Sequence, residues 1–281
     1  MKEKPASERH RTLEQIREHY EIEKELAAKL RNASRQERRC LYSSLYEELY
    51  LRVPDHPQLT RKMSPQETKA TVAAQINCIK PLLNKTIIFL EVGPGDCALS
   101  TEVAKFVKQV YAVDVSNEIT KSLVRPPNFK LILSDGTSIP VPHNSVDIAY
   151  SNQLMEHLHP DDAFEQLRNI YNALTYGGVY ICLTPNRLNG PHDVSKYFDQ
   201  AAMGFHLKEY TNCELRDLFR KVGFSHARVQ IEVKRKCFRI PVSLVVSLER
   251  LLMYLPHSLR NSVARSALLK VLLRTRFVGI K

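Results

Sequence analysis

The stretch TIIFLEVGPGDCALSTEVAKF, residues 86–106, decides the fold of this chain. It begins with a β-branched apolar run that leads to Glu91, continues through Gly93-Pro94-Gly95, and ends in the apolar spacing of an amphipathic helix. This order predicts a strand, a glycine turn and the N-terminus of a helix. At such a junction a ligand can approach backbone N–H groups that no side chain shields.

Two further strands are predicted downstream, and each ends on an acidic residue. VYAVD ends on Asp114, 21 residues after Gly93, and FKLILSDG ends on Asp135-Gly136, 21 residues after Asp114. These intervals fit one strand and its connection in a parallel sheet. Because the carboxyl ends of such strands meet at one edge, the acidic residues are expected to line a single crevice that binds a ligand.

Two classes of cofactor compete for this crevice. As a G-x-G-x-x-A pattern, Gly93, Gly95 and Ala98 fit a dinucleotide fingerprint, with Asp114 in the position that binds the ribose. Glu91 argues against a dinucleotide, because its carboxylate would repel the pyrophosphate above the turn. S-adenosylmethionine carries a sulfonium and an ammonium instead, and a carboxylate attracts these by roughly a few kcal/mol at partly buried distances. The charges therefore favour S-adenosylmethionine.

The same reasoning gives roles to the strand ends. Asp114 would accept hydrogen bonds from the two ribose hydroxyls, and Asp135 would accept one from the adenine amino group. Together with SNQLMEHL, residues 151–158, these features resemble the successive motifs of class I S-adenosylmethionine-dependent methyltransferases, in particular the broad small-molecule group that includes the quinone-biosynthesis methylases. The resemblance extends from Thr86 to Lys234. It departs at Cys97, where the family has a third glycine, and a side chain this small is expected to fit.

The resemblance implies both a fold and a set of cofactor contacts. The fold is a Rossmann-like α/β sheet that is mostly parallel, with its last strand antiparallel and formed by RFVGIK at residues 276–281. The residues that would bind S-adenosylmethionine are Glu91, Gly93, Gly95, Asp114, Asp135, Gly136 and Asn152. The alternative is a domain of this fold that has lost its cofactor.

A helical extension is predicted ahead of the sheet, over residues 1–83. Apolar residues recur at helical spacing over 9–31, and Ser34 and Glu37 form a capping box that opens a second helix. A third helix begins in the same way at Ser64 and leads into the first strand. In the second helix a stripe of tyrosines forms either a packing face or, through one member, part of the substrate site: Tyr42, Tyr46 and Tyr50.

Methyl transfer requires an acceptor beside the cofactor, and the loop after the fourth strand is one candidate for its site. This loop carries Asn152, Gln153, Glu156 and His157. It lacks the N-P-P-Y type motif of adenine-modifying methylases, which argues against N-methylation of a base. Its M-E-H is similar to that of metal-dependent quinone O-methylases, but Gln153 stands in place of their first carboxylate, so no metal is predicted.

The loop after the fifth strand, residues 184–211, is the second candidate. An oxygen acceptor usually requires a base that takes its proton. The sequence offers His192 or His206 as this base, oriented by Asp193, and His157 on the preceding loop as a further catalytic candidate. The alternative is that these polar residues only bind a long loop onto the domain.

Positive charge is concentrated at the C-terminal end. Residues 234–281 contain eleven Lys or Arg and one acidic residue, Glu249, so they carry +10 of the chain's net charge of +11. Residues 84–281 would form the methyltransferase domain, with a helical insertion at about 237–274 before the last strand. Its two predicted helices, on either side of Pro256, combine apolar and basic faces. Three interpretations remain open: a lid on the domain, an interfacial element on anionic lipid, or an RNA-binding surface, for which aromatic residues are sparse.

The composition favours a cytoplasmic enzyme. A chain of 281 residues with 43% hydrophobic residues can bury a full core. The N-terminal residues contain no apolar signal-peptide segment, and the longest apolar run is too short and too polar to span a bilayer. The six cysteines are predicted to be reduced thiols.

The sequence thus predicts a cytoplasmic S-adenosylmethionine-dependent methyltransferase acting on a small-molecule or lipid-linked acceptor, with oxygen as the expected acceptor atom. Peripheral membrane association through the basic C-terminal helices is one of the open interpretations of that segment, and nucleic acid is not an expected partner. Alternatives from other classes are an RNA methyltransferase, a dinucleotide-dependent oxidoreductase and a non-catalytic protein that binds S-adenosylmethionine.

Overall fold

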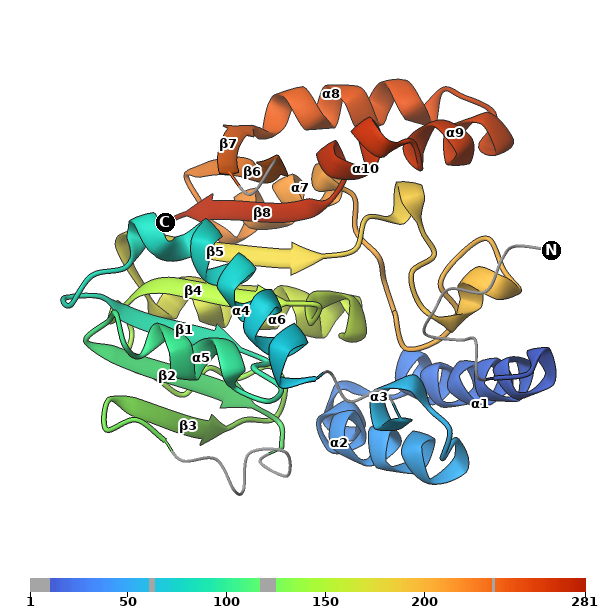
Figure 1. Ribbon diagram of the computed structural model, residues 1–281, viewed down its shortest axis with the longest axis horizontal. Helices are drawn as coiled ribbons and strands as arrows, with labels where there is room; N and C mark the ends of the chain where they lie inside the picture. Colours follow the sequence, from blue (N-terminus) through green and yellow to red (C-terminus); the bar gives the residue numbers. More distant parts are fainter. Residues whose placement is uncertain (1–10, 61–63, 117–124, 234–235) are drawn as a thin grey trace.

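A computed structural model of the protein describes residues 11–60, 64–116, 125–233 and 236–281 (Figure 1). These residues form an eight-stranded sheet of order β3-β2-β1-β4-β5-β8-β6-β7. The strands are β1 (Ile88–Val92), β2 (Gln109–Asp114), β3 (Phe129–Leu133), β4 (Val146–Asn152), β5 (Leu174–Thr184), β6 (His226–Val233), β7 (Lys236–Pro241) and β8 (Thr275–Ile280).

The sheet is mixed, as the sequence predicts. β3, β2, β1, β4 and β5 pair in parallel, and β8 runs antiparallel between β5 and β6, with Val179 opposite Ile280 and Val278 opposite Arg228. The strand order reverses between β1 and β4. In open α/β sheets ligands bind outside the carboxyl ends of the strands at this reversal, and the glycine turn after β1 lies there.

Helices cover both faces of the sheet. α4 (Pro65–Ile79) and α5 (Ala98–Val103) bury apolar side chains with β1 and β2, whereas α6 (Pro160–Ala173) and α7 (Asn212–Val222) pack into the core on the other face. α7 is capped by Thr211 and ends at Gly223. Because helices cover the central strands on both faces, successive side chains of these strands are apolar in the sequence.

The N-terminal helices are α1 (Leu13–Asn32), α2 (Arg35–Arg52) and the short α3 (Pro57–Thr60), which the sequence does not predict. The capping boxes predicted at Ser34 and at Ser64 are both present, and a third, at Thr12, opens α1. The predicted start of the first helix, at residue 9, lies outside the described residues. α1 to α3 lie beside the carboxyl ends of the central strands (Figure 1), whereas α4 packs on the sheet. The domain boundary between residues 83 and 84 stays a prediction.

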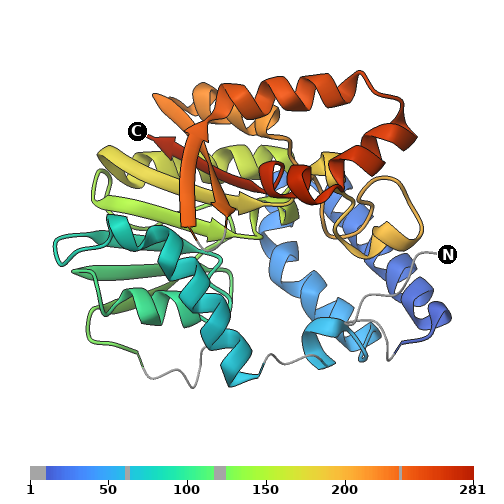
Figure 2. The ribbon, with the colours of Figure 1, turned by 45° about the horizontal axis from the view of Figure 1, so that its top comes forward.

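The insertion before the last strand differs from its prediction in two respects. Residues 236–241, where the predicted helical insertion begins, form strand β7 instead. This strand pairs antiparallel with β6 at the edge of the sheet, where its backbone satisfies hydrogen-bonding groups of β6. The helical part begins at α8 (Val242–Met253), and after Pro256 the chain forms two helices instead of one. These are α9 (His257–Ala264) and α10 (Ala267–Leu272). Together with α8 they lie on the side of the molecule where β6 and β7 form the edge of the sheet (Figures 1 and 2).

β7 also changes the prediction for the cysteines. Its Cys237 is bonded to Cys78 of α4 in a disulfide, so the prediction of six free thiols is wrong for these two residues. They are 159 positions apart in sequence, and only the edge pairing of β7 brings them together. The other four, Cys40, Cys97, Cys182 and Cys213, are free. None of the helices in the described parts of the chain is long and apolar enough to cross a membrane.

Candidate functional site

The turn after β1 has the backbone that its glycines require. Gly93 and Gly95 adopt φ angles of 67° and 56°, in the left-handed region that favours glycine. A Cβ on Gly93 would lie 3.0 Å from a terminal carbon of Leu154, whereas one on Gly95 would meet no atom within 4 Å. Gly93 therefore allows close packing under the β4 loop, and Gly95 faces open space at the crevice.

Cys97 occupies the third glycine position and confirms that a small side chain fits. It is completely buried, and its φ of 58° lies in the left-handed region. This conformation costs a non-glycine residue about 1–2 kcal/mol. The turn thus keeps the backbone of a glycine at a position that carries a thiol.

Glu91 at the end of β1 is a buried carboxylate beside this turn. Its side chain accepts a hydrogen bond from Ser100, and none of the ion pairs among the described residues involves it. Burial raises the pKa of Glu91 to about 8, and the negative charges of Asp96 and Asp114 act in the same direction. A cation bound here would find a carboxylate that lacks a counter-charge.

Asp114 at the end of β2 lies next to the same turn. Its Oδ1 accepts from the backbone N–H groups of Val115 and Ser116, at 2.7 and 3.3 Å. Burial raises its pKa, and the N–H groups of Ser116, Val115 and Gly95 partly offset that effect. The structure therefore brings Glu91, Gly95 and Asp114 together, as predicted.

Asp135, at the third strand end, already has partners within the protein, and its predicted contact with adenine, like that of Gly136 with the cofactor, stays a prediction. Oδ1 of Asp135 accepts from Thr137 N and Ser138 N, and Oδ2 pairs with Arg39 of α2 at 3.1 Å. Although burial favours the neutral acid, these hydrogen bonds outweigh it and lower the pKa of Asp135 to about 2. The carboxylate is already engaged, so an adenine amino group would share Oδ2 with Arg39.

The end of β4 completes the cofactor side. Asn152 is half-buried and pairs with Leu183 of β5, and the next residue, Gln153, adopts a φ of 54°. Its N–H donates to the Leu183 carbonyl at 2.8 Å. This turn redirects the chain, so that Glu156 and His157 face the loop after β5.

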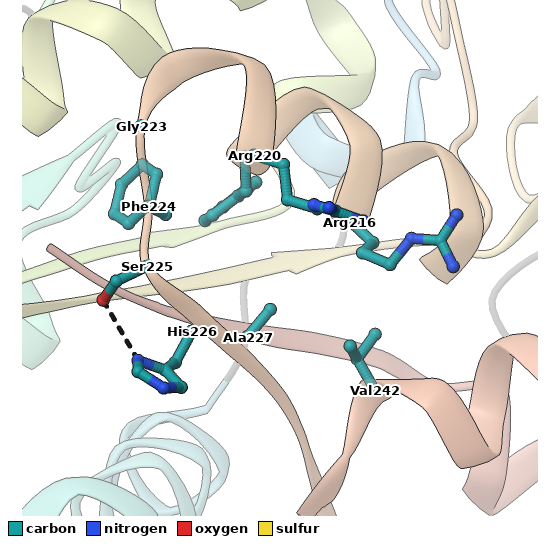
Figure 3. Close-up of a pocket in the computed structure, with 9 residues that line it drawn as sticks. Arg216, Arg220, Gly223, Phe224, Ser225, His226, Ala227 and Val242 are labelled. Carbon is teal, nitrogen blue, oxygen red and sulfur yellow. Dashed lines mark hydrogen bonds between the residues drawn. The ribbon is translucent and has the colours of Figure 1, made fainter.

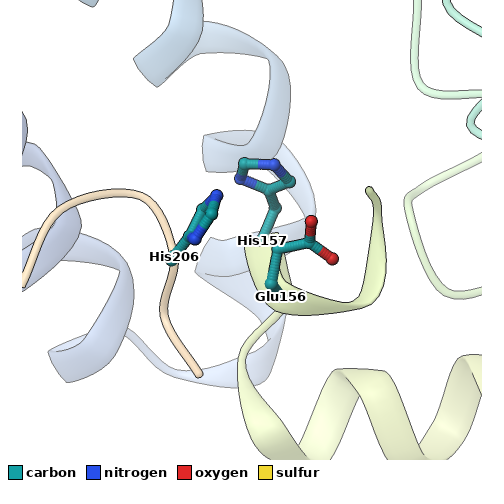
Figure 4. A group of neighbouring side chains, drawn as sticks. All are labelled: Glu156, His157 and His206. Atoms are coloured by element: carbon teal, nitrogen blue, oxygen red, sulfur yellow. The ribbon is translucent and has the colours of Figure 1, made fainter. Parts of the chain in front are cut away.

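Three predicted residues meet on the acceptor side. The carboxylate of Glu156 and the ring nitrogens of His157 and His206 have atoms within 4.8 Å of one another (Figure 4). Glu156 is fully buried; its Oε2 accepts from Thr184 Oγ1 at 2.9 Å, and its Oε1 has no hydrogen-bond partner in the described structure. Burial raises the pKa of Glu156 to about 7.

The hydrogen bonds of the two histidines indicate which nitrogen of each carries hydrogen. His157 Nδ1 lies 3.1 Å from the Phe205 carbonyl, which only accepts, so we assign the hydrogen to Nδ1 and leave Nε2 as the acceptor. Burial lowers the pKa of His157 to about 4. His206 Nδ1 lies 2.8 Å from Glu209 Oε1, which assigns Nδ1–H in the same way. In the neutral form of each ring, Nε2 therefore carries no hydrogen and can accept a hydrogen bond or a proton.

Glu209 takes the role that the sequence assigned to Asp193. Its Oε1 contacts His206, and its Oε2 lies 3.2 Å from His192 Nδ1, so one carboxylate orients both histidines. Asp193 instead accepts from the backbone N–H groups of Ser195 and Gly204, both at 3.0 Å. The three-residue spacing of His206 and Glu209 in HLKE is the signal that sequence reasoning missed.

Carboxylates dominate the electrostatics at His206. Burial alone would lower its pKa, but the hydrogen bond to Glu209 and the charges of Glu156, Glu209 and Asp193 outweigh burial and raise it. Glu209 itself is kept ionised: despite burial, its bonds to His192 and His206 lower its pKa to about 2. His206 is consequently a more basic imidazole than usual.

The N-terminal helices hold this loop in place, which sequence reasoning did not predict. Arg31 of α1 donates to the carbonyls of Met203 and Gly204 at 2.8 and 3.0 Å, and Glu23 accepts from Phe205 N at 2.9 Å. From α2, Tyr46 reaches His157 Nδ1 with its hydroxyl at 2.9 Å. Helices α1 and α2 therefore line the acceptor side of the site. For Tyr46 the contact is with a candidate site residue, in addition to packing.

A separate depression of about 380 Å³ lies between the end of α7 and the start of β6, lined by Arg216, Arg220 and His226 among others (Figure 3). β6 and β5 run in the same direction, because both are antiparallel to β8. The start of β6 is therefore at the sheet edge opposite the glycine turn. This depression is remote from Glu91 and His206, so we exclude it as the site of their chemistry.

Comparisons with known proteins agree with this geometry. The methyltransferase domain family matches residues 90–182. A probable S-adenosylmethionine-dependent methyltransferase of Mycolicibacterium smegmatis is 29% identical over 137 residues, which cover 48% of this chain and 51% of that protein. A counterpart in Mycobacterium tuberculosis is 29% identical over 136 residues, 48% of this chain and 47% of that protein. The match thus spans about half the length of these relatives.

Solved structures share the fold. A S-adenosylmethionine-dependent methyltransferase from Archaeoglobus fulgidus superimposes with a TM-score of 0.51 at 16% identity, over 76% of this chain and 94% of that one. Phosphoethanolamine N-methyltransferase 1 of Haemonchus contortus, solved with phosphoethanolamine and S-adenosylhomocysteine, gives 0.51 at 15% identity, over 72% of this chain and 46% of that one. The oxidoreductase and RNA methyltransferase hypotheses gain no support. Residues 90–182 thus match the methyltransferase domain family, and the sheet has the fold of solved S-adenosylmethionine-dependent methyltransferases.

Proposed function

We propose that this protein transfers the methyl group of S-adenosylmethionine to a hydroxyl oxygen of a small-molecule or lipid-linked acceptor, with His206 as the base. The observation that carries the proposal is the pair formed by His206 and Glu209. The carboxylate holds Nδ1–H at 2.8 Å, so that Nε2 of the neutral ring is a hydrogen-bond acceptor, and by raising the pKa of the imidazole it makes this nitrogen a stronger base.

The cofactor would lie across the carboxyl ends of β1 and β2. The cationic donor would lower the pKa of the buried Glu91 carboxyl on binding and pair with the carboxylate, and Asp114 would supply acceptors for the ribose. Methyl transfer is an in-line displacement, so positioning contributes most of the rate enhancement. The acceptor oxygen forms a bond to the methyl carbon, the sulfur keeps the electron pair of the broken bond, and the hydroxyl proton moves to Nε2 of His206.

Glu156, His157 and His206 also satisfy the geometric requirement for a divalent cation. The buried Oε1 of Glu156, without a partner among the described residues, favours this second possibility. A bound cation would occupy Nε2 of His206 and acidify the acceptor hydroxyl in its place. Chelation distinguishes the two, because a base needs no metal and activity would then survive EDTA treatment.

Transfer of a labelled methyl group from S-adenosylmethionine to fractionated small molecules and lipids provides the assay. We expect His206→Ala to lower turnover by about 10²–10⁴, the usual contribution of a general base, and to leave S-adenosylhomocysteine affinity unchanged. His143→Ala is the matched control, because His143 is exposed in a turn away from this loop. Full activity of His206→Ala would refute the assignment of the base. Transfer to no acceptor by the wild-type protein would favour a non-catalytic binding role.

A further inference from the structure

The outer side of the C-terminal insertion is apolar. On α8, Leu244 and Leu251 are 62% and 66% exposed, and Tyr254, which caps its C-terminus, is 87% exposed. α9 continues this surface with the exposed Leu259 and Val263. The intervals of seven and three residues place the α8 side chains on one side of the helix. We call these five residues the α8–α9 face.

This exposure does not result from a loosely attached helix. The opposite side of α8 is buried through Val245, Val246 and Leu252. Between them, the fully buried Glu249 accepts from Asn186 Nδ2 at 2.8 Å and from the backbone N–H groups at the start of α7. α8 is therefore anchored by its inner side, and its outer side remains apolar where a solvated helix normally carries polar residues.

Within the C-terminal segment, the charge near the α8–α9 face has one sign. The single acidic residue of the C-terminal segment, Glu249, is buried beneath α8 and fully used as an acceptor. Arg250 is exposed one turn before Tyr254, Arg260 follows Leu259, and Lys270 is exposed on α10. This combination of exposed aliphatic and aromatic side chains with cations matches the boundary layer of an anionic bilayer, where apolar groups enter below the lipid phosphates.

We propose that the α8–α9 face docks the protein on an anionic lipid surface. Leu244, Leu251 and Tyr254 would enter the headgroup region, while the arginines contact lipid phosphates. The lid interpretation is compatible with this role, because the insertion would use opposite sides for the two contacts: the inner side packs on the domain and the outer side would face the lipid. Figure 2 shows α8 running along the top of the view, at the outer side of the molecule.

The docked insertion also contacts the acceptor loop. Glu249 binds Asn186, and Arg265 donates to the Gly190 carbonyl at 2.8 Å, two residues before His192. Lipid docking would therefore place the histidine loop next to the bilayer, where a lipid-linked acceptor is presented. This last step rests on the proposed function, whereas docking itself does not.

Sedimentation of the full chain with vesicles tests the proposal. We expect binding to phosphatidylglycerol-containing vesicles at low salt, release as salt rises, and no binding to pure phosphatidylcholine vesicles. Replacing Leu244, Leu251 and Tyr254 by Ser should weaken binding by about tenfold or more for each side chain removed from the lipid. The charge reversals Arg250→Glu and Arg260→Glu should abolish the salt-sensitive part.

The matched control is Leu51→Ser with Tyr176→Ser, which removes two side chains of 83% and 86% exposure from other surfaces. This control should bind vesicles like the wild type. Failure of the wild type to bind anionic vesicles, or full binding by the triple Ser variant with an unchanged melting temperature, would overturn the proposal. So would RNA retention or self-association that is lost in that variant while vesicle binding is absent. Vesicle binding without methyl transfer would uphold the surface and refute only the proposed function.

Discussion

Glu91 allows a direct test of how the site recognises its cofactor, because its charge should depend on occupancy. With a pKa of about 8, roughly nine in ten ligand-free molecules hold a proton on this carboxyl at pH 7. S-adenosylhomocysteine carries an ammonium group, which favours the carboxylate and lowers its pKa on binding. Binding should therefore release nearly one proton at pH 7. Affinity should rise by about tenfold per pH unit from about pH 6 to pH 8 and level off above that.

Calorimetry in two buffers of different ionisation enthalpy measures the proton release directly. Glu91→Gln cannot titrate, so its weaker affinity should not vary over this range. The same substitution should stabilise the ligand-free protein. A carboxyl that ionises at 4.5 unfolded and at about 8 folded loses stability as pH rises between those values, by roughly 3 kcal/mol at pH 7. A pH-independent affinity of the wild type, or a Gln variant that binds equally well, would refute the reasoning.

Three further predictions concern neighbouring residues. Asp114→Ala should cost roughly 2–3 kcal/mol of S-adenosylhomocysteine affinity, the usual value for hydrogen bonds to a charged group, and calorimetry on the folded variant will detect it. Glu209→Gln should lower the pH at which turnover reaches half its maximum, because the pKa of His206 falls when the charge that raises it is removed; an unchanged pH profile would exclude His206 as the titrating base. Arg31→Ala should lower turnover and spare cofactor affinity, because within the described residues Arg31 donates hydrogen bonds to carbonyls of the acceptor loop, at Met203, Gly204 and His206; equal loss of both would indicate general destabilisation.

The cofactor side could be predicted from sequence because its signals are local. The glycine turn, Glu91 and Asp114 belong to short stretches in which strand, turn and helix each impose their own residues. The capping boxes at Ser34 and Ser64 are equally local, spanning three residues each. The two helices that these capping boxes open therefore begin where the sequence predicts, at Arg35 and Pro65.

The acceptor side could not be predicted to the same extent, because its contacts join distant segments. The pair between Arg39 and Asp135, and the contact between Tyr46 and His157 across 111 positions, depend on how α2 packs beside the sheet. No periodicity in either segment encodes that packing. Strand β7 was missed for a related reason: its pairing with β6 is a property of the sheet edge, and short apolar segments fit helix and strand equally well.

The hydrogen bonds between α1 and the acceptor loop have a consequence for the exchange of backbone hydrogens with solvent. The amides of Gly204 and Phe205 lie outside any regular helix or strand, yet they donate to the buried carboxylates of Asp193 and Glu23. Both hydrogens should consequently exchange slowly, as those of a core strand do, and that of Phe205 only when the first helix, which carries Glu23, moves away. Exchange at the Phe205 amide therefore reports the opening of a helix 182 residues earlier in the chain.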